Sequence, residues 1–148
     1  MSGSVSILAL WGLCLGLTAL CWRLGGEPER RAAGMLFAAY AFSVLLGWVR
    51  IEGLKPAVVA ADVLLAIGLG WLAIAYRRWW LLMAAANAVL VVIAHATVFL
   101  EPSIHQRAYI AYRMLPGLVI PLCAGLGAWE RWLAGEPACA GWLRTRAA

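Results

Sequence analysis

Long apolar runs, separated by short segments that carry charge, follow one another through most of this chain. Three of these apolar runs follow one another closely between Ala57 and Trp129. Residues 77–80 separate the first from the second, and residues 101–107 separate the second from the third. A run of about 20 apolar residues is long enough to cross the hydrocarbon core of a bilayer as an α-helix. The pattern therefore predicts a bundle of membrane-spanning helices rather than a water-soluble domain.

The composition agrees with this prediction. The chain is 65% hydrophobic and 13% charged, whereas soluble globular domains are about 45–50% apolar and about 25% charged. Its 148 residues suit a single domain. The net charge of +5 is carried by basic residues at the ends of apolar runs. No nucleic-acid partner is expected, because that would require a clustered basic surface.

We expect an all-α fold, an integral membrane bundle of five transmembrane helices. The expected spans are 7–22, 32–49, 57–76, 79–100 and 108–128. The first span has no basic residue before it and Arg23 after it, the reverse of a cleaved signal peptide. We expect this span to be retained; four would remain if it were removed. Residues 129–148, broken by glycines and a proline and rich in Trp and Arg, are expected to form a short cytoplasmic tail at the membrane interface.

Positive charge is divided unevenly between the two sides of this bundle. One side carries eight basic residues, namely Arg23, Arg30, Arg31, Arg77, Arg78, Arg131, Arg144 and Arg146. The other side carries three, namely Arg50, Lys55 and Arg107. Cytoplasmic segments of membrane proteins are the richer in Lys and Arg. The N-terminus is therefore expected outside and the C-terminus in the cytoplasm.

Three ionisable residues fall inside the last three spans at one depth. Asp62, His95 and Arg113 each lie five residues from the outer end of their span, which is about 7–8 Å at 1.5 Å per residue. Charges at such depths face the bundle interior and find partners. We expect Asp62 to pair with Arg113 and His95 to bond to either. Tyr109, one turn before Arg113, could add its hydroxyl.

Four interpretations of this cluster stay open. It could fix how the helices pack, handle protons or ions through His95, bind a small anion at Arg113, or support catalysis. Two further polar residues, Asn87 and Tyr40, are expected to bond within the bundle and help the helices pack.

No metal or other cofactor is expected. The four cysteines, Cys14, Cys21, Cys123 and Cys139, show no C-x-x-C spacing. His95 with Asp62 lacks a third strong metal ligand. His105 lies in a loop, too close in sequence to His95 for the two to face each other across a haem.

The chain resembles a group of known proteins at single residues and short motifs that are separated by apolar segments. They are Asp62, Arg77-Arg78-Trp79-Trp80, Asn87, His95, Glu101-Pro102 and Ala108-Tyr109. In these the chain resembles a loose group of small polytopic bacterial inner-membrane proteins of unknown function. The resemblance implies a multi-pass protein of the bacterial inner (plasma) membrane, and it implies no activity.

Two classes of function follow from the sequence. The first is a non-catalytic accessory or assembly subunit of a membrane complex, bound to a membrane-protein partner or to copies of itself. The alternative is a small transporter or proton-coupled unit that uses the Asp62, His95 and Arg113 cluster. An enzyme is the less expected class, because the short loops leave little room for a soluble active site.

Overall fold

The computed structural model describes residues 2–50, 55–100 and 106–135, with side chains described for 9–50, 55–100 and 114–135. Within these residues the chain folds into five α-helices and contains no strand. They are α1 (Ser2–Leu24), α2 (Glu27–Leu46), α3 (Pro56–Tyr76), α4 (Trp79–Leu100) and α5 (Gln106–Leu133). The predicted all-α bundle of five helices is confirmed for the described part of the chain.

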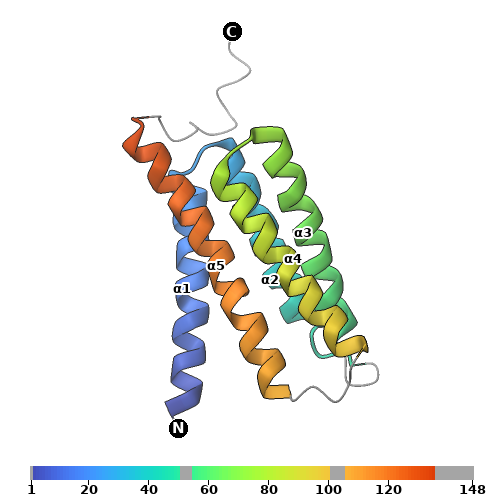
Figure 1. The fold of residues 1–148 in the computed structure, drawn as a ribbon. Helices are drawn as coiled ribbons and strands as arrows, with labels where there is room; N and C mark the ends of the chain where they lie inside the picture. Colours follow the sequence, from blue (N-terminus) through green and yellow to red (C-terminus); the bar gives the residue numbers. More distant parts are fainter. Residues whose placement is uncertain (1, 51–54, 101–105, 136–148) are drawn as a thin grey trace.

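Consecutive helices run in opposite directions along one bundle (Figure 1). Each helix packs against the next helix along the chain. Helix α5 also packs against α1, which closes the ring. A further contact joins α2 to α5 across the interior. The α1–α2 turn, the α3–α4 turn and the C-terminal end of α5 therefore share one end of the bundle (Figure 1).

The α1–α2 turn is built on Gly25 and Gly26. The Gly25 amide donates to Cys21 O at 2.9 Å and closes α1, while Glu29 Oε2 accepts from the Gly26 amide at 2.8 Å and opens α2. Helix α2 begins at Glu27, five residues before the predicted span, because acidic residues and Pro28 suit the first turn of a helix. It ends at Leu46 instead of the predicted 49.

The α3–α4 turn contains Arg77 in the left-handed conformation, with φ 51° and ψ 36°. Its amide donates to Ala73 O at 3.0 Å, which caps α3. The left-handed conformation of a non-glycine residue destabilises the fold by roughly 1–2 kcal/mol. It allows α4 to start two residues after α3 ends. This is the tight hairpin that the sequence predicts at Arg77-Arg78.

Helix α5 continues through Pro116 and Pro121 and extends to Leu133, five residues beyond the predicted end of its span. The first five residues of the predicted tail, 129–133, are therefore helical. Gly135, at φ 69°, follows the helix, and its amide donates to Trp132 O at 3.1 Å. The rest of the predicted tail, 136–148, lies outside the described residues.

The best-packed part of the bundle lies towards the end with the two short turns. Trp80, 1% exposed, packs directly against the backbone of α5 at Gly127, where an added Cβ would lie 2.4 Å from the ring. Leu36, Leu69, Leu72 and Leu81 are each no more than 1% exposed and join the same core.

Large apolar side chains also cover the outside of the bundle. On α3 the residues Leu64, Ile67, Trp71 and Ile74 all face outward. Helices α3 and α4 are each long and apolar enough to cross a membrane, judged by length and composition, and Ala9–Leu24 in α1 is a shorter apolar segment.

Candidate functional site

Asp62 on α3 and His95 on α4 meet between neighbouring antiparallel helices. Asp62 Oδ2 lies 2.8 Å from His95 Nε2, within hydrogen-bond distance. The side chain of His95 is 5% exposed and that of Asp62 is 17% exposed. A hydrogen bond between an imidazole and a carboxylate, largely removed from solvent, holds the two helices in register.

The side chains of Arg113 and Tyr109 lie outside the described residues, although both positions belong to α5. The predicted pairing of Asp62 with Arg113, and the predicted contribution of Tyr109, therefore stay predictions. Of the four residues named for ligand or proton handling, the structure brings Asp62 and His95 together.

A cavity of about 430 Å³ adjoins this pair. Asp62 lies on its wall with three other polar residues, Tyr40, Ser43 and Lys55. The remaining wall is mostly apolar and draws on all five helices, including Trp11, Cys14, Leu36, Val58, Leu65, Ala88, Val91, Met114, Gly117, Leu118 and Ile120. Small-molecule sites commonly have volumes of about 300–1,000 Å³, apolar walls and a few placed polar groups.

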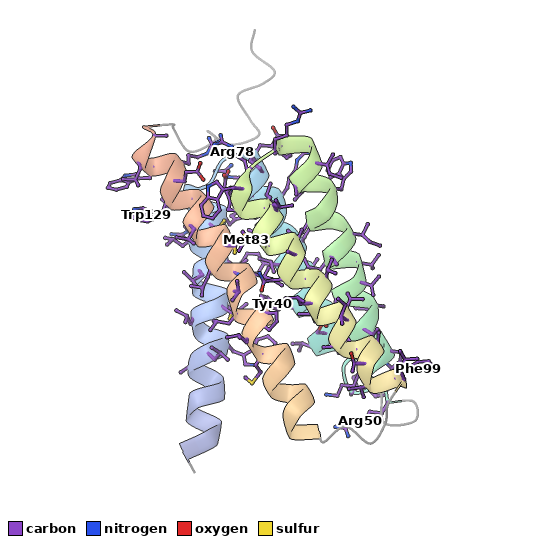
Figure 2. The ribbon with its side chains drawn as sticks, in the orientation of Figure 1. Tyr40, Arg50, Arg78, Met83, Phe99 and Trp129 are labelled. Carbon is purple, nitrogen blue, oxygen red and sulfur yellow. The ribbon has the colours of Figure 1, made fainter. Side chains whose placement is uncertain are left out.

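Tyr40 and Asn87 were predicted to assist helix packing. Tyr40 makes an edge-on contact with Trp11 of α1, with ring centroids 5.6 Å apart at 66°, and Figure 2 shows Tyr40 within the bundle. Asn87 Nδ2 donates to Met83 O of its own helix at 2.8 Å, and not to a neighbouring helix as we expected. That residue is partly exposed, so a bond back to its own backbone satisfies the amide locally.

A second polar cluster, absent from the sequence-based predictions, lies at the opposite end from Lys55. Glu29 is 1% exposed, and its Oε2 accepts from the Gly26 amide and lies 3.5 Å from Arg131 Nε. The Arg131 guanidinium rests on the α1–α2 turn, where a Cβ at Gly26 would lie 2.3 Å from its Cζ. The sequence signal for this cluster was Gly-Gly followed three residues later by a glutamate, the spacing of a helix-capping carboxylate.

The residue before Arg131 contacts the other turn at the same end. Glu130 Oε1 lies 3.6 Å from Arg78 Nη1, and Glu130 Oε2 accepts from Trp79 Nε1 at 2.8 Å. Figure 2 places Arg78 at this end of the bundle and Arg50 at the other. Adjacent residues of α5 thus contact the α1–α2 turn and the α3–α4 turn.

Cys21 lies beneath this cluster and is fully buried. Its Sγ donates to Ala124 O at 3.3 Å, with Glu29 O also nearby at 3.6 Å. The thiol thereby links α1 to both α5 and the start of α2.

The hydrogen bond between Asp62 and His95 ties α3 to α4, and it is also a contact across which an imidazole and a carboxylate can pass a proton. Within the described ranges 2–50, 55–100 and 106–135, no three His, Cys, Asp or Glu residues are grouped so as to hold a metal ion.

Comparisons with known proteins give no relative from which to carry over a function. No family model matches the chain, and neither the curated proteins nor the solved structures contain a significant match.

Proposed function

We propose that this chain is a polytopic membrane protein that binds a small, mostly apolar solute in the cavity beside Asp62 and couples that binding to a proton at Asp62–His95. The observation that carries the proposal is that Asp62 belongs both to the wall of the 430 Å³ cavity and to the buried pair with His95. A solute in the cavity would therefore contact the same carboxylate that exchanges protons.

The location of all five helices in the bilayer is part of this proposal. The helices have 20 to 28 residues each, and about 20 suffice to cross a bilayer. In the most apolar 18-residue stretch of α3, only 39% is buried inside the bundle, and the share in α4 is the same. In water the remaining apolar surface would be costly to expose, whereas lipid accommodates it.

The orientation follows from charge. We place the protein in a bacterial inner membrane. The end of the bundle with Arg50 and Lys55 then faces the outside, and the end with Arg77, Arg78 and Arg131 faces the cytoplasm. The N-terminus would then be outside and the C-terminus inside. Since Lys55 lines the cavity, solute would enter from the outer side.

The chemistry of the wall suggests the kind of solute. Most of it is apolar, with hydroxyls at Tyr40 and Ser43 and opposite charges at Asp62 and Lys55. An amphipathic molecule with an aromatic or aliphatic body and one polar group would match this wall.

An accessory or assembly subunit is the second candidate. Leu45 and Trp48 near the end of α2 are 70% and 76% exposed. This surface would suit a membrane-protein partner or a second copy as well as lipid.

Proton movement in reconstituted vesicles tests the proposal. The purified chain is placed in vesicles that contain a pH-sensitive dye, and benzylamine, benzoate or benzyl alcohol is added outside. We expect at least one of the three to provoke a proton flux that His95→Gln abolishes, because Gln keeps a hydrogen bond but does not titrate. Asn87→Ala, outside the cavity, should retain the flux. Equal flux in wild type and His95→Gln would reject proton coupling at this pair.

A further inference from the structure

At the end of the bundle with the α1–α2 and α3–α4 turns, the end that we place in the cytoplasm, two adjacent residues of α5 make polar contacts. Arg131 lies against Glu29 and the Gly26 backbone, and Glu130 contacts Arg78 and Trp79. We call these five side chains, Glu29, Arg78, Trp79, Glu130 and Arg131, the α5 latch. They connect the C-terminal end of α5 to both turns, which lie at the same end of the bundle (Figure 1).

Tight packing lies between the latch and the cavity. Cys21 is bonded to Ala124 O, and Trp80 sits against Gly127 with no space for a Cβ. A path from the cavity past these two contacts would require the C-terminal part of α5 to move away from α1 and α4.

Helix α5 has a place at which such a movement can occur. Pro116 lies among the cavity-lining residues of α5, and Pro121 comes directly after the last of them, Ile120, on the way to the latch. Each proline lacks the amide hydrogen that would bond one turn back, and helices bend at such positions. Met114, Gly117 and Ile120, around these prolines, line the cavity. Bending here would leave the outer part of α5 in place and swing its cytoplasmic part.

The two ion pairs of the α5 latch differ in burial, and this bears on how easily the latch can open. Glu130 and Arg78 are 37% and 35% exposed, and exposed ion pairs contribute little to stability. Glu29 and Arg131 are much more buried, at 2% and 15%, so their separation is the costly step. Both pairs must release before α5 can move.

We infer that the cytoplasmic part of α5, from Pro121 to Leu133, is the inner gate of the cavity and that the α5 latch holds it closed. This inference rests on the proposed function for its purpose. Its test does not, because opening can be measured without a solute.

The chain supplies its own reporter for the gate. Cys21 lies beneath the latch, and Cys14, which lines the cavity, lies two turns away on the same helix. Two single-cysteine chains are made, one retaining Cys21 and one retaining Cys14, with the other three cysteines replaced by Ala. Each is labelled in vesicles with a water-soluble maleimide from the cytoplasmic or the outer side.

In the Cys21 chain, Glu29→Gln and Arg131→Gln should each raise cytoplasmic labelling by about tenfold or more, the change expected when a charge-assisted bond no longer favours the closed state. Gln at position 29 can still accept from the Gly26 amide, so α2 should start normally. The matched control is Glu27→Gln, two residues earlier, which removes an exposed ion pair with Arg31. It should leave labelling unchanged.

Labelling of the Cys14 chain from the outer side should be the same in all variants, which shows that the cavity stays intact. If Cys21 stays as slow as in wild type while Cys14 is unaffected, the gate is rejected. Should Glu29→Gln not accumulate, Arg78→Gln and Trp79→Phe test the exposed part of the latch and should raise Cys21 labelling by a smaller factor. Absence of solute-driven proton flux with normal gate opening would reject the proposed function and keep the gate.

Discussion

Asp62 and His95 are 33 residues apart in the chain, yet Asp62 Oδ2 and His95 Nε2 lie 2.8 Å apart. Asp62 lines the cavity, whereas His95 is among the most buried polar residues of the described chain. The carboxylate thus lies between the cavity and the imidazole. This order means that a change at Asp62 should affect both helix packing and the cavity, while a change at His95 should act through Asp62.

Removing the carboxylate should destabilise the bundle. Asp62→Ala takes away a hydrogen-bond partner of the buried His95, and we expect a loss of about 1–3 kcal/mol in the free energy of unfolding. Asn87→Ala should cost less than about 1 kcal/mol, because this partly exposed amide donates to a carbonyl of its own helix. Unfolding by SDS in mixed micelles measures both. Equal losses would contradict the distinction.

The predicted pairing of Asp62 with Arg113 adds a second measurement. If the pair forms, Asp62→Ala removes the charge that balances the Arg113 guanidinium, and Arg113→Ala should partly relieve the damage. The double variant should then be more stable than Asp62→Ala alone. A double variant that loses the sum of the two single losses would show that the residues do not interact.

The tight contact between Trp80 and Gly127 predicts a large effect for a small substitution. Gly127→Ala places a Cβ 2.4 Å from the indole ring, and we expect a loss of about 1–3 kcal/mol from overpacking. Gly117→Ala on the same helix is the control, because nothing lies within 4 Å of its added Cβ. It should be neutral or stabilising, since Ala favours a helix by about 1 kcal/mol over Gly. Thermal denaturation in detergent would measure both, and similar values would refute the packing argument.

The orientation can be tested with single cysteines at the two ends of the bundle. Lys55→Cys should react with an impermeant maleimide added outside intact cells, and Arg77→Cys should react only after the membrane is opened. Both positions are exposed in the structure, so a lack of reaction at Arg77→Cys in intact cells would reflect the membrane. Reaction of both positions from the same side would contradict the five-span arrangement.

The sequence was sufficient to predict the meeting of α3 and α4 but not the contacts of α5. Asp62 lies six residues after the start of α3 at Pro56, and His95 lies five residues before the end of α4 at Leu100, so the antiparallel arrangement of the two helices brings them to nearly one level. Glu29 and Arg131 are far apart in the chain, and their contact requires α5 to continue past 128. The sequence shows Gly135 and Pro137 but not which residue ends the helix, so Arg131 was assigned to the tail.

The cavity was beyond prediction for a different reason. Its walls come from all five helices, and its volume depends on which small residues coincide at one level. Gly117 on α5 and Ala88 on α4 leave that space, yet many other glycines and alanines in the chain do not border a cavity. Hydrophobic periodicity places a residue on a helix face and does not fix the rotation of five helices about their axes.

Filling the cavity separates its role from that of the Asp62–His95 pair. Gly117 lines the cavity, and an added Cβ there meets nothing within 4 Å. We expect Gly117→Leu to take up part of the 430 Å³ and to abolish the solute-driven proton flux while leaving the stability of the bundle near that of wild type. Gly70→Leu on α3 is the matched control, because Gly70 also has open space at its Cβ but does not line the cavity. Its flux should persist. If Gly117→Leu keeps the flux at matched protein level, the solute does not occupy this cavity, and proton movement at His95 would need another explanation.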